Sequence, residues 1–184
     1  MMRINVRFAG AGGQGVILAA VELAEAYALR EDYNISQTQS YGPEARGGAC
    51  KAEVVISDEE IDYMKVDDAD VFVALNQAGF NKYLSKSKKN AMVLINSTLV
   101  ESSDPTHYQI PATEIAEKLQ NPKGVNMVML GALTKLLPKL HYPSVEQQIK
   151  DRFEGKLADL NLQAYHAGYE YMAALLAPAR SVKN

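Results

Sequence analysis

The residues best suited to binding a ligand form a glycine-rich run near the start of the chain. Residues 10–15 read GAGGQG and match the pattern GxGxxG, with candidate binding residues Gly10, Gly12, Gly13, Gln14 and Gly15. Between a strand and a helix, such glycines allow a tight turn, a backbone approach to a phosphate and close helix packing. An anion at the helix N-terminus would be favoured. The alternative is a compact turn that holds no ligand or contacts another subunit.

A second candidate segment lies at residues 40–48, which read SYGPEARGG. Glycines beside Arg46 free the backbone there, so its planar guanidinium could meet a carboxylate or phosphate at two points. The alternative is that Arg46 pairs locally with Glu44 or holds the loop to its own domain. The candidate binding residues of this segment are Tyr41, Gly42, Pro43, Glu44, Arg46, Gly47 and Gly48.

A self-sufficient NAD(P) enzyme would carry a further acidic residue. In dinucleotide-binding proteins this acidic residue lies about 20 residues beyond the glycines, at the end of the second strand, and its carboxylate binds the ribose hydroxyls. Residues 35–40 read ISQTQS, while Glu31 and Asp32 precede that strand and Glu44 lies inside the following loop. A self-sufficient NAD(P)-binding enzyme is therefore a weaker hypothesis than an enzyme subunit whose two loops bind a ligand or a partner. A purely structural subunit that binds no ligand is the third hypothesis.

A few other polar residues are candidates. Asn76 follows one apolar strand and Asn96 follows another, where ligands of open α/β sheets bind, although either residue can instead cap the next helix. Cys50 is expected to be a buried, unreactive thiol. The three histidines lack metal-ligand spacing, so we expect no metal site.

The elements that must position these residues follow from hydrophobic periodicity. Strands are predicted at 3–9, 34–38, 53–57, 71–75, 91–95 and 108–110, and helices at 13–29, 77–86, 112–119, 125–137, from the capping box Ser144 to Gln147 onward, and at 156–176. They indicate an α/β fold: a Rossmann-like three-layer domain over residues 1–184, with a largely parallel sheet flanked by helices and a helical C-terminal part. The last helix carries two apolar stripes, which indicates either a deep core position or a face reserved for another subunit.

Composition excludes several classes of function. The chain has 184 residues, a formal net charge of -3 and no basic stripe, which argues against nucleic acid as a partner. Its single cysteine cannot supply the ligands of an iron–sulfur cluster. No apolar run approaches the ~18 residues of a membrane span, and the first ten residues look like a strand rather than a leader, so we expect a cytoplasmic protein without membrane contact.

Several longer motifs resemble one family. GAGGQGVILAA at 10–20, SYGPEARGG at 40–48, AEVVISDEEI at 52–61, DADVFVALNQAGFNKYL at 68–84 and NMVMLGAL at 126–133 are similar, in order and spacing, to gamma subunits of 2-oxoacid:ferredoxin oxidoreductases. The glycine run is most like the 2-oxoglutarate branch, with pyruvate and indolepyruvate branches as the other options.

The resemblance implies a subunit rather than a complete catalyst. The family's complexes oxidatively decarboxylate a 2-oxoacid with coenzyme A to acyl-CoA and CO₂ and reduce ferredoxin or a similar acceptor. They use thiamine diphosphate, Mg and iron–sulfur clusters, carried by alpha, beta and in some complexes ferredoxin-like delta subunits. We therefore expect no catalytic residue and no cofactor bound by this chain alone. Its two loops would shape a subunit interface or the coenzyme A entrance, and homodimer contacts are a further expectation.

Overall fold

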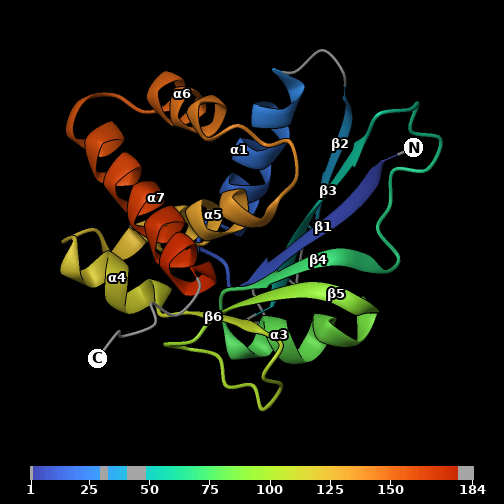
Figure 1. The fold of residues 1–184 in the computed structure, drawn as a ribbon, viewed down its shortest axis with the longest axis horizontal. Coiled ribbons are helices and arrows are strands. Elements are labelled where there is room, and N and C mark those ends of the chain that lie inside the picture. Colours follow the sequence, from blue (N-terminus) through green and yellow to red (C-terminus); the bar gives the residue numbers. More distant parts are fainter. Residues whose placement is uncertain (1, 30–32, 41–48, 178–184) are drawn as a thin grey trace, which may run out of the picture.

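A six-stranded sheet forms the centre of the protein. The computed structural model describes residues 2–29, 33–40 and 49–177. The strands are β1 (Arg3–Gly10), β2 (Asn34–Gln39), β3 (Cys50–Ser57), β4 (Ala69–Ala74), β5 (Ser87–Asn96) and β6 (Tyr108–Ile110), in the spatial order β2-β3-β1-β4-β5-β6 (Figure 1). β1, β4, β5 and β6 pair in parallel, whereas β3 is antiparallel to both β1 and β2. The largely parallel sheet predicted from the sequence is confirmed, with β3 as the one reversed strand.

Helices cover both faces of the sheet. On one face lie α1 (Val16–Ala28) and α5 (Val125–Leu136), with α4 (Ala112–Lys118), α6 (Tyr142–Arg152) and α7 (Gly155–Leu176) beside and beyond them (Figure 1). Val6 and Phe8 of β1 pack into the core on that side. On the opposite face lie α3 (Gln77–Tyr83) and the 3-10 turn η1 (Leu84–Lys86), which pack on Ala9 and Phe72. The alternation along β1 therefore sends residues to two separate cores.

The two long C-terminal helices cross in close backbone contact. A Cβ atom at Gly131 of α5 would lie 1.9 Å from the Tyr165 carbonyl oxygen, and one at Gly168 of α7 would lie 1.8 Å from the Val128 carbonyl oxygen. Only glycine allows this approach. Met172 continues the buried side of α7, whereas three apolar residues at its two ends are exposed, namely Leu157, Leu175 and Leu176. One side of the helix, rather than both apolar stripes, is thus packed in the core.

One predicted helix start differs from the structure. α6 begins at Tyr142 with His141 at its N-cap, so Ser144 already lies in the first turn and the predicted capping box does not form. Pro at the first turn explains the earlier start, because its fixed φ suits that position. α4 begins at Ala112, as predicted, and the hydroxyl of Thr113 in its first turn accepts a hydrogen bond from Asn96 (2.9 Å). The short 3-10 turn η2 (Pro122–Gly124) leads into α5.

Candidate functional site

The glycine run forms the turn between β1 and α1, as its pattern predicts. The left-handed residues are Gly13, with φ 87°, and Gly15, with φ 73°. Gly10 ends β1 and is needed for space instead, because a Cβ there would lie 2.8 Å from Gln14 Oε1 and 3.1 Å from Leu75 Cβ. The positive φ angles that the turn requires therefore lie farther along the run, at Gly13 and Gly15.

Two helices hold this turn in place. Gly79 of α3 lies so close to β1 that its Cβ would stand 2.8 Å from the backbone nitrogen of Gly10. Asn126 of α5 donates a hydrogen bond to the Gly15 carbonyl (3.3 Å). Gln14 folds back and accepts a hydrogen bond from the Ala11 amide (2.7 Å), so that amide is already satisfied within the turn. The conformation is therefore fixed by the protein itself.

An apolar hollow lies beside the turn. It has a volume of about 550 Å³, within the range of small-molecule sites, and is lined by Ala11, Gly12, Gly13, Gly15, Val16, Ile17, Leu18, Val21, Ser40, Cys50 and Arg152. No side chain caps the N-terminus of α1 among the described residues. The hollow thus combines an aliphatic wall with the uncapped amide end of a helix, an arrangement that suits an apolar chain attached to an anionic group.

Arg152 is the one charged residue among the described residues that line this hollow, and acidic residues of α1 hold it there. Its Nη2 lies 2.6 Å from Glu25 Oε2, and its Nε pairs with Glu22. The Glu22 side chain is fully buried, and this burial raises the pKa of its carboxyl above the ordinary value, although Arg152 acts in the opposite direction. Arg152 therefore links α6 to α1 at the rim of the hollow.

Two described residues next to the segment 41–48 line the hollow. Ser40 and Cys50 both line the hollow, and Ser40 N donates to the Lys51 carbonyl (3.0 Å). Tyr41, Gly42, Pro43, Glu44, Arg46, Gly47 and Gly48 lie outside the described residues. Cys50 is 4% exposed, and burial raises the pKa of its thiol, which agrees with the buried, unreactive cysteine expected from the sequence.

The two asparagines at strand ends organise the backbone. Asn76 Oδ1 accepts a hydrogen bond from the Gly79 amide (2.8 Å) and so caps α3. Asn96, fully buried, donates to the Leu75 carbonyl (3.2 Å) and accepts from the Thr113 amide (3.2 Å). Their capping and bridging contacts fix the two helix starts at this edge of the sheet.

The sheet order gives a structural reason for the missing ribose carboxylate. β3, rather than the strand that follows α1, lies directly beside β1, and it begins there with Cys50 opposite Gly10. The acidic residue of β3 is Glu53, and its Oε1 lies 2.6 Å from the Nε of the buried Arg7. Both side chains lie on one face of the sheet, and Phe8 lies on the other. No carboxylate of these strands thus reaches the glycine turn to hold a ribose.

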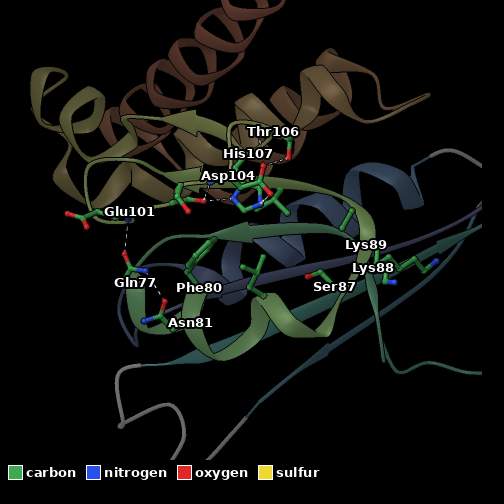
Figure 2. A pocket seen from close by; sticks show the side chains of 15 residues that line it. Gln77, Phe80, Asn81, Ser87, Lys88, Lys89, Glu101, Asp104, Thr106 and His107 are labelled. Carbon is green, nitrogen blue, oxygen red and sulfur yellow. Dashed lines mark hydrogen bonds and ion pairs between the residues drawn. The ribbon is translucent and has the colours of Figure 1, made fainter.

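A second hollow, of about 460 Å³, lies between α3 and the segment before β6 (Figure 2). The sequence did not single it out, although it brings Ser102, His107 and Asp104 together. Ser102 Oγ lies 2.7 Å from His107 Nδ1, and Asp104 Oδ2 lies 3.5 Å from Nε2. The Asp104 carboxylate also accepts two hydrogen bonds from Thr106, and the imidazole packs on Phe80, so the group fastens a surface loop rather than activating a nucleophile.

Within the described ranges, no group of three or more His, Cys, Asp or Glu residues is arranged to hold a metal ion. None of the described helices is long and apolar enough to cross a membrane. His166 contacts Glu146 (2.6 Å), and Tyr142 lies beside it in an aromatic cluster between α6 and α7.

Sequence comparison relates the chain to one family. Residues 5–171 match the family described as "Pyruvate ferredoxin/flavodoxin oxidoreductase". The 2-oxoglutarate synthase subunit KorC of Methanocaldococcus jannaschii is 46% identical over 175 residues, which cover 92% of this chain and 94% of that protein. KorC of Methanothermobacter marburgensis is 40% identical over 179 residues, 92% of this chain and 96% of its own.

Solved structures show the same fold. The gamma subunit of a keto/oxoacid ferredoxin oxidoreductase from Geobacter sulfurreducens superposes with a TM-score of 0.81 at 34% identity, over 93% of this chain and 99% of that chain. The 2-oxoglutarate:ferredoxin oxidoreductase of Magnetococcus marinus, with 2-oxoglutarate, coenzyme A and succinyl-CoA bound, gives 0.85 at 25% identity. That match covers 97% of this chain and 32% of the longer one, so the present fold corresponds to one part of that chain.

Proposed function

The chain belongs to the pyruvate ferredoxin/flavodoxin oxidoreductase family, and on that premise we propose that it is the gamma subunit of a 2-oxoglutarate:ferredoxin oxidoreductase. The observation that carries the proposal is the 46% identity to a 2-oxoglutarate synthase subunit over nearly the whole length of both proteins. The complex would convert 2-oxoglutarate and coenzyme A to succinyl-CoA and CO₂ and pass two electrons to ferredoxin.

Catalysis belongs to partner subunits in this proposal. Alpha and beta subunits would hold thiamine diphosphate and Mg, and other chains, including a ferredoxin-like delta subunit, would carry the iron–sulfur clusters. The lone Cys50 is buried, so it is a poor ligand for any cluster. This chain contributes a rigid surface to the assembly and acts in the cytoplasm.

The hollow beside the glycine turn is our candidate for a part of the coenzyme A entrance. The pantetheine arm of coenzyme A is a flexible chain with few charges, which suits the aliphatic wall formed by Ile17 and Val21. Its phosphates suit the uncapped N-terminal amides of α1 beside the turn. Arg152 lies at the rim but is already paired with Glu22 and Glu25. Gly10, Gly12, Gly13, Gln14 and Gly15 would fix the floor, and the segment 41–48, with Arg46, would complete the site in the complex. Asn76 would act by holding α3 against the turn.

Reconstitution tests the subunit assignment. The purified chain is mixed with its alpha, beta and delta partners, and reduction of ferredoxin is followed with 2-oxoglutarate, pyruvate or indolepyruvate as substrate. We expect activity that needs the partners and coenzyme A and that is highest with 2-oxoglutarate. Turnover by the isolated chain, or a complex that works only with another 2-oxoacid, would contradict the assignment.

A matched pair of variants tests the coenzyme A entrance separately. Ile17→Gln places an amide at the wall of the hollow, whereas Leu29→Gln makes the same type of change just beyond the other end of α1, at a 56% exposed position. We expect Ile17→Gln to raise the KM for coenzyme A about tenfold in the complex, with the KM for 2-oxoglutarate unchanged, because it disturbs binding of one substrate only. If both variants changed the KM for coenzyme A equally, the hollow would not be part of the coenzyme A entrance, and a purely structural role of the chain would be favoured.

A further inference from the structure

A third hollow lies on the sheet face opposite α1 and is lined by four cationic side chains. We call it the lysine trough. It has a volume of about 600 Å³ and is bordered by β1, β2, β3, the segment before β4 and η1. Its cationic residues are Arg7, Lys51, Lys65 and Lys86, and its carboxylates are Glu53 and Asp67. The trough is therefore cationic, although the whole chain has a net charge of -3.

The floor of the trough is a buried charge cluster. Arg7 is 1% exposed, and its Nε donates to Glu53 Oε1 (2.6 Å). Lys51 Nζ donates to the same carboxylate oxygen (2.9 Å). Two cations thus compensate Glu53, and this carboxylate opposes an incoming anion only weakly.

Arg7 also fixes the two segments that carry the other lysines. Its Nη1 donates to the Lys86 carbonyl (2.5 Å), and its Nη2 donates to the Val66 carbonyl (2.5 Å), next to Lys65. One buried guanidinium thereby holds the backbone at both places. Lys65 and Lys86 are exposed, and within the described part of the chain neither has an ion-pair partner. Two free ammonium groups consequently stand on a rigid frame at one concave surface.

The remaining groups of the trough fit a phosphate better than an extended acidic peptide. Thr38 adds a hydroxyl group at its border, whereas the Ser40 hydroxyl is engaged by the Lys51 backbone. The Asp67 carboxylate accepts a hydrogen bond from the Tyr63 hydroxyl (3.1 Å). Of the two carboxylates that the described residues give the trough, it is the one without a described cationic partner. A compact dianion can contact two lysines at once, and a volume of this size accommodates a small molecule. A peptide carrying single carboxylates would gain less at each lysine.

From this geometry we propose that the lysine trough is a binding site for the phosphate or pyrophosphate group of a small molecule, separate from the glycine turn. The site does not depend on the proposed subunit role, because it lies on the other face of the sheet and is formed by this chain alone.

Titration of the ¹⁵N-labelled full chain with inorganic pyrophosphate tests the proposal, with ADP in a parallel titration. We expect saturable amide shifts at Thr38, Lys51 and Lys65, and weaker binding as salt shortens the range of the lysine charges. ADP binding more tightly than pyrophosphate would identify a nucleotide as the ligand, and equal affinities would identify free pyrophosphate; either result supports the site.

Charge variants provide the control. The double variant Lys65→Gln/Lys86→Gln should weaken pyrophosphate binding about tenfold or more, since two charge-assisted hydrogen bonds are lost. Lys123→Gln/Lys156→Gln changes the net charge equally at exposed, distant positions and should leave the affinity within about twofold. Equal losses in both variants, or shifts confined to residues 11–17, would overturn the proposal. So would binding of a hexaglutamate peptide at the trough without any binding of pyrophosphate.

Discussion

The glycine turn permits a test in which two similar substitutions should differ for a known reason. Gly13 and Gly15 both have positive φ, so alanine at either position strains the backbone by about 1–2 kcal/mol. A Cβ at Gly13 meets no atom within 4 Å, whereas a Cβ at Gly15 would lie 2.4 Å from Asn126 Nδ2 and 2.7 Å from its Cγ. The second substitution therefore carries an additional steric cost.

The size of that cost follows from the surroundings of Asn126. This residue is 3% exposed and lies on α5, so its side chain has little room to move away. Overpacking of this kind costs about 1–3 kcal/mol. We expect Gly13→Ala to lower the free energy of unfolding by about 1–2 kcal/mol and Gly15→Ala to lower it by about 2–5 kcal/mol.

Urea unfolding of the full chain, followed by circular dichroism, measures both values. Asn126→Ala removes the side chain that Gly15→Ala would meet, so the two changes should be coupled in a double-mutant cycle by about 1–3 kcal/mol. If Gly15→Ala proves no more damaging than Gly13→Ala, or if the cycle shows no coupling, the packing of α5 on the turn is not what requires glycine there.

Three further predictions concern buried charges and the thiol. Burial raises the pKa of the Glu22 carboxyl, so folding favours its protonated form. The free energy of unfolding of the wild type, relative to that of Glu22→Gln, should therefore fall as the pH rises above 4.5, the ordinary pKa of the group. Urea unfolding midpoints measured over a pH series check this. Glu53→Ala leaves the buried Arg7 without its carboxylate and should lower the free energy of unfolding by about 3 kcal/mol, against under about 1 kcal/mol for Lys51→Ala, because the Lys51 side chain is 28% exposed; a Glu53 variant as stable as wild type would contradict this reasoning. Because the Cys50 thiol is buried, it should react with a thiol reagent no faster than the chain unfolds, with both rates measured at the same urea concentration. Fast labelling of the native protein would show that the thiol is accessible.

Local patterns in the sequence were sufficient to predict the strands, the helices and the glycine turn. The apolar alternation in residues 3–9 correctly assigned Ile4, Val6 and Phe8 to one face, and all three pack in the same core. The roles of individual glycines were not predictable, because φ depends on how the whole turn packs against Asn126 and Gly79. The direction of β3 was not predictable either, since an apolar run buried on both faces gives no indication of strand orientation.

The lysine trough was missed for a different reason. Its residues come from β1, β3, η1 and a loop, so no single segment of sequence contains them. One local signal was present. Arg7 stands between Val6 and Phe8, where the alternation assigns it to a solvent-facing side, yet it is fully surrounded. A polar residue predicted to be exposed becomes buried when another segment covers that face, and this depends on tertiary structure alone.

The reversed direction of β3 also affects how this protein can vary. In a purely parallel sheet, every connection at the carboxyl edge must lead into a crossover helix, so its length is limited by helix packing. Here β2 ends and β3 begins at that same edge, because the two strands are antiparallel. The Ser40 amide donates a hydrogen bond to the Lys51 carbonyl and so joins the two ends of the connection. Closing a longer loop between fixed ends costs little additional entropy. Related proteins can therefore change the length of the connection between β2 and β3 while the sheet itself stays the same.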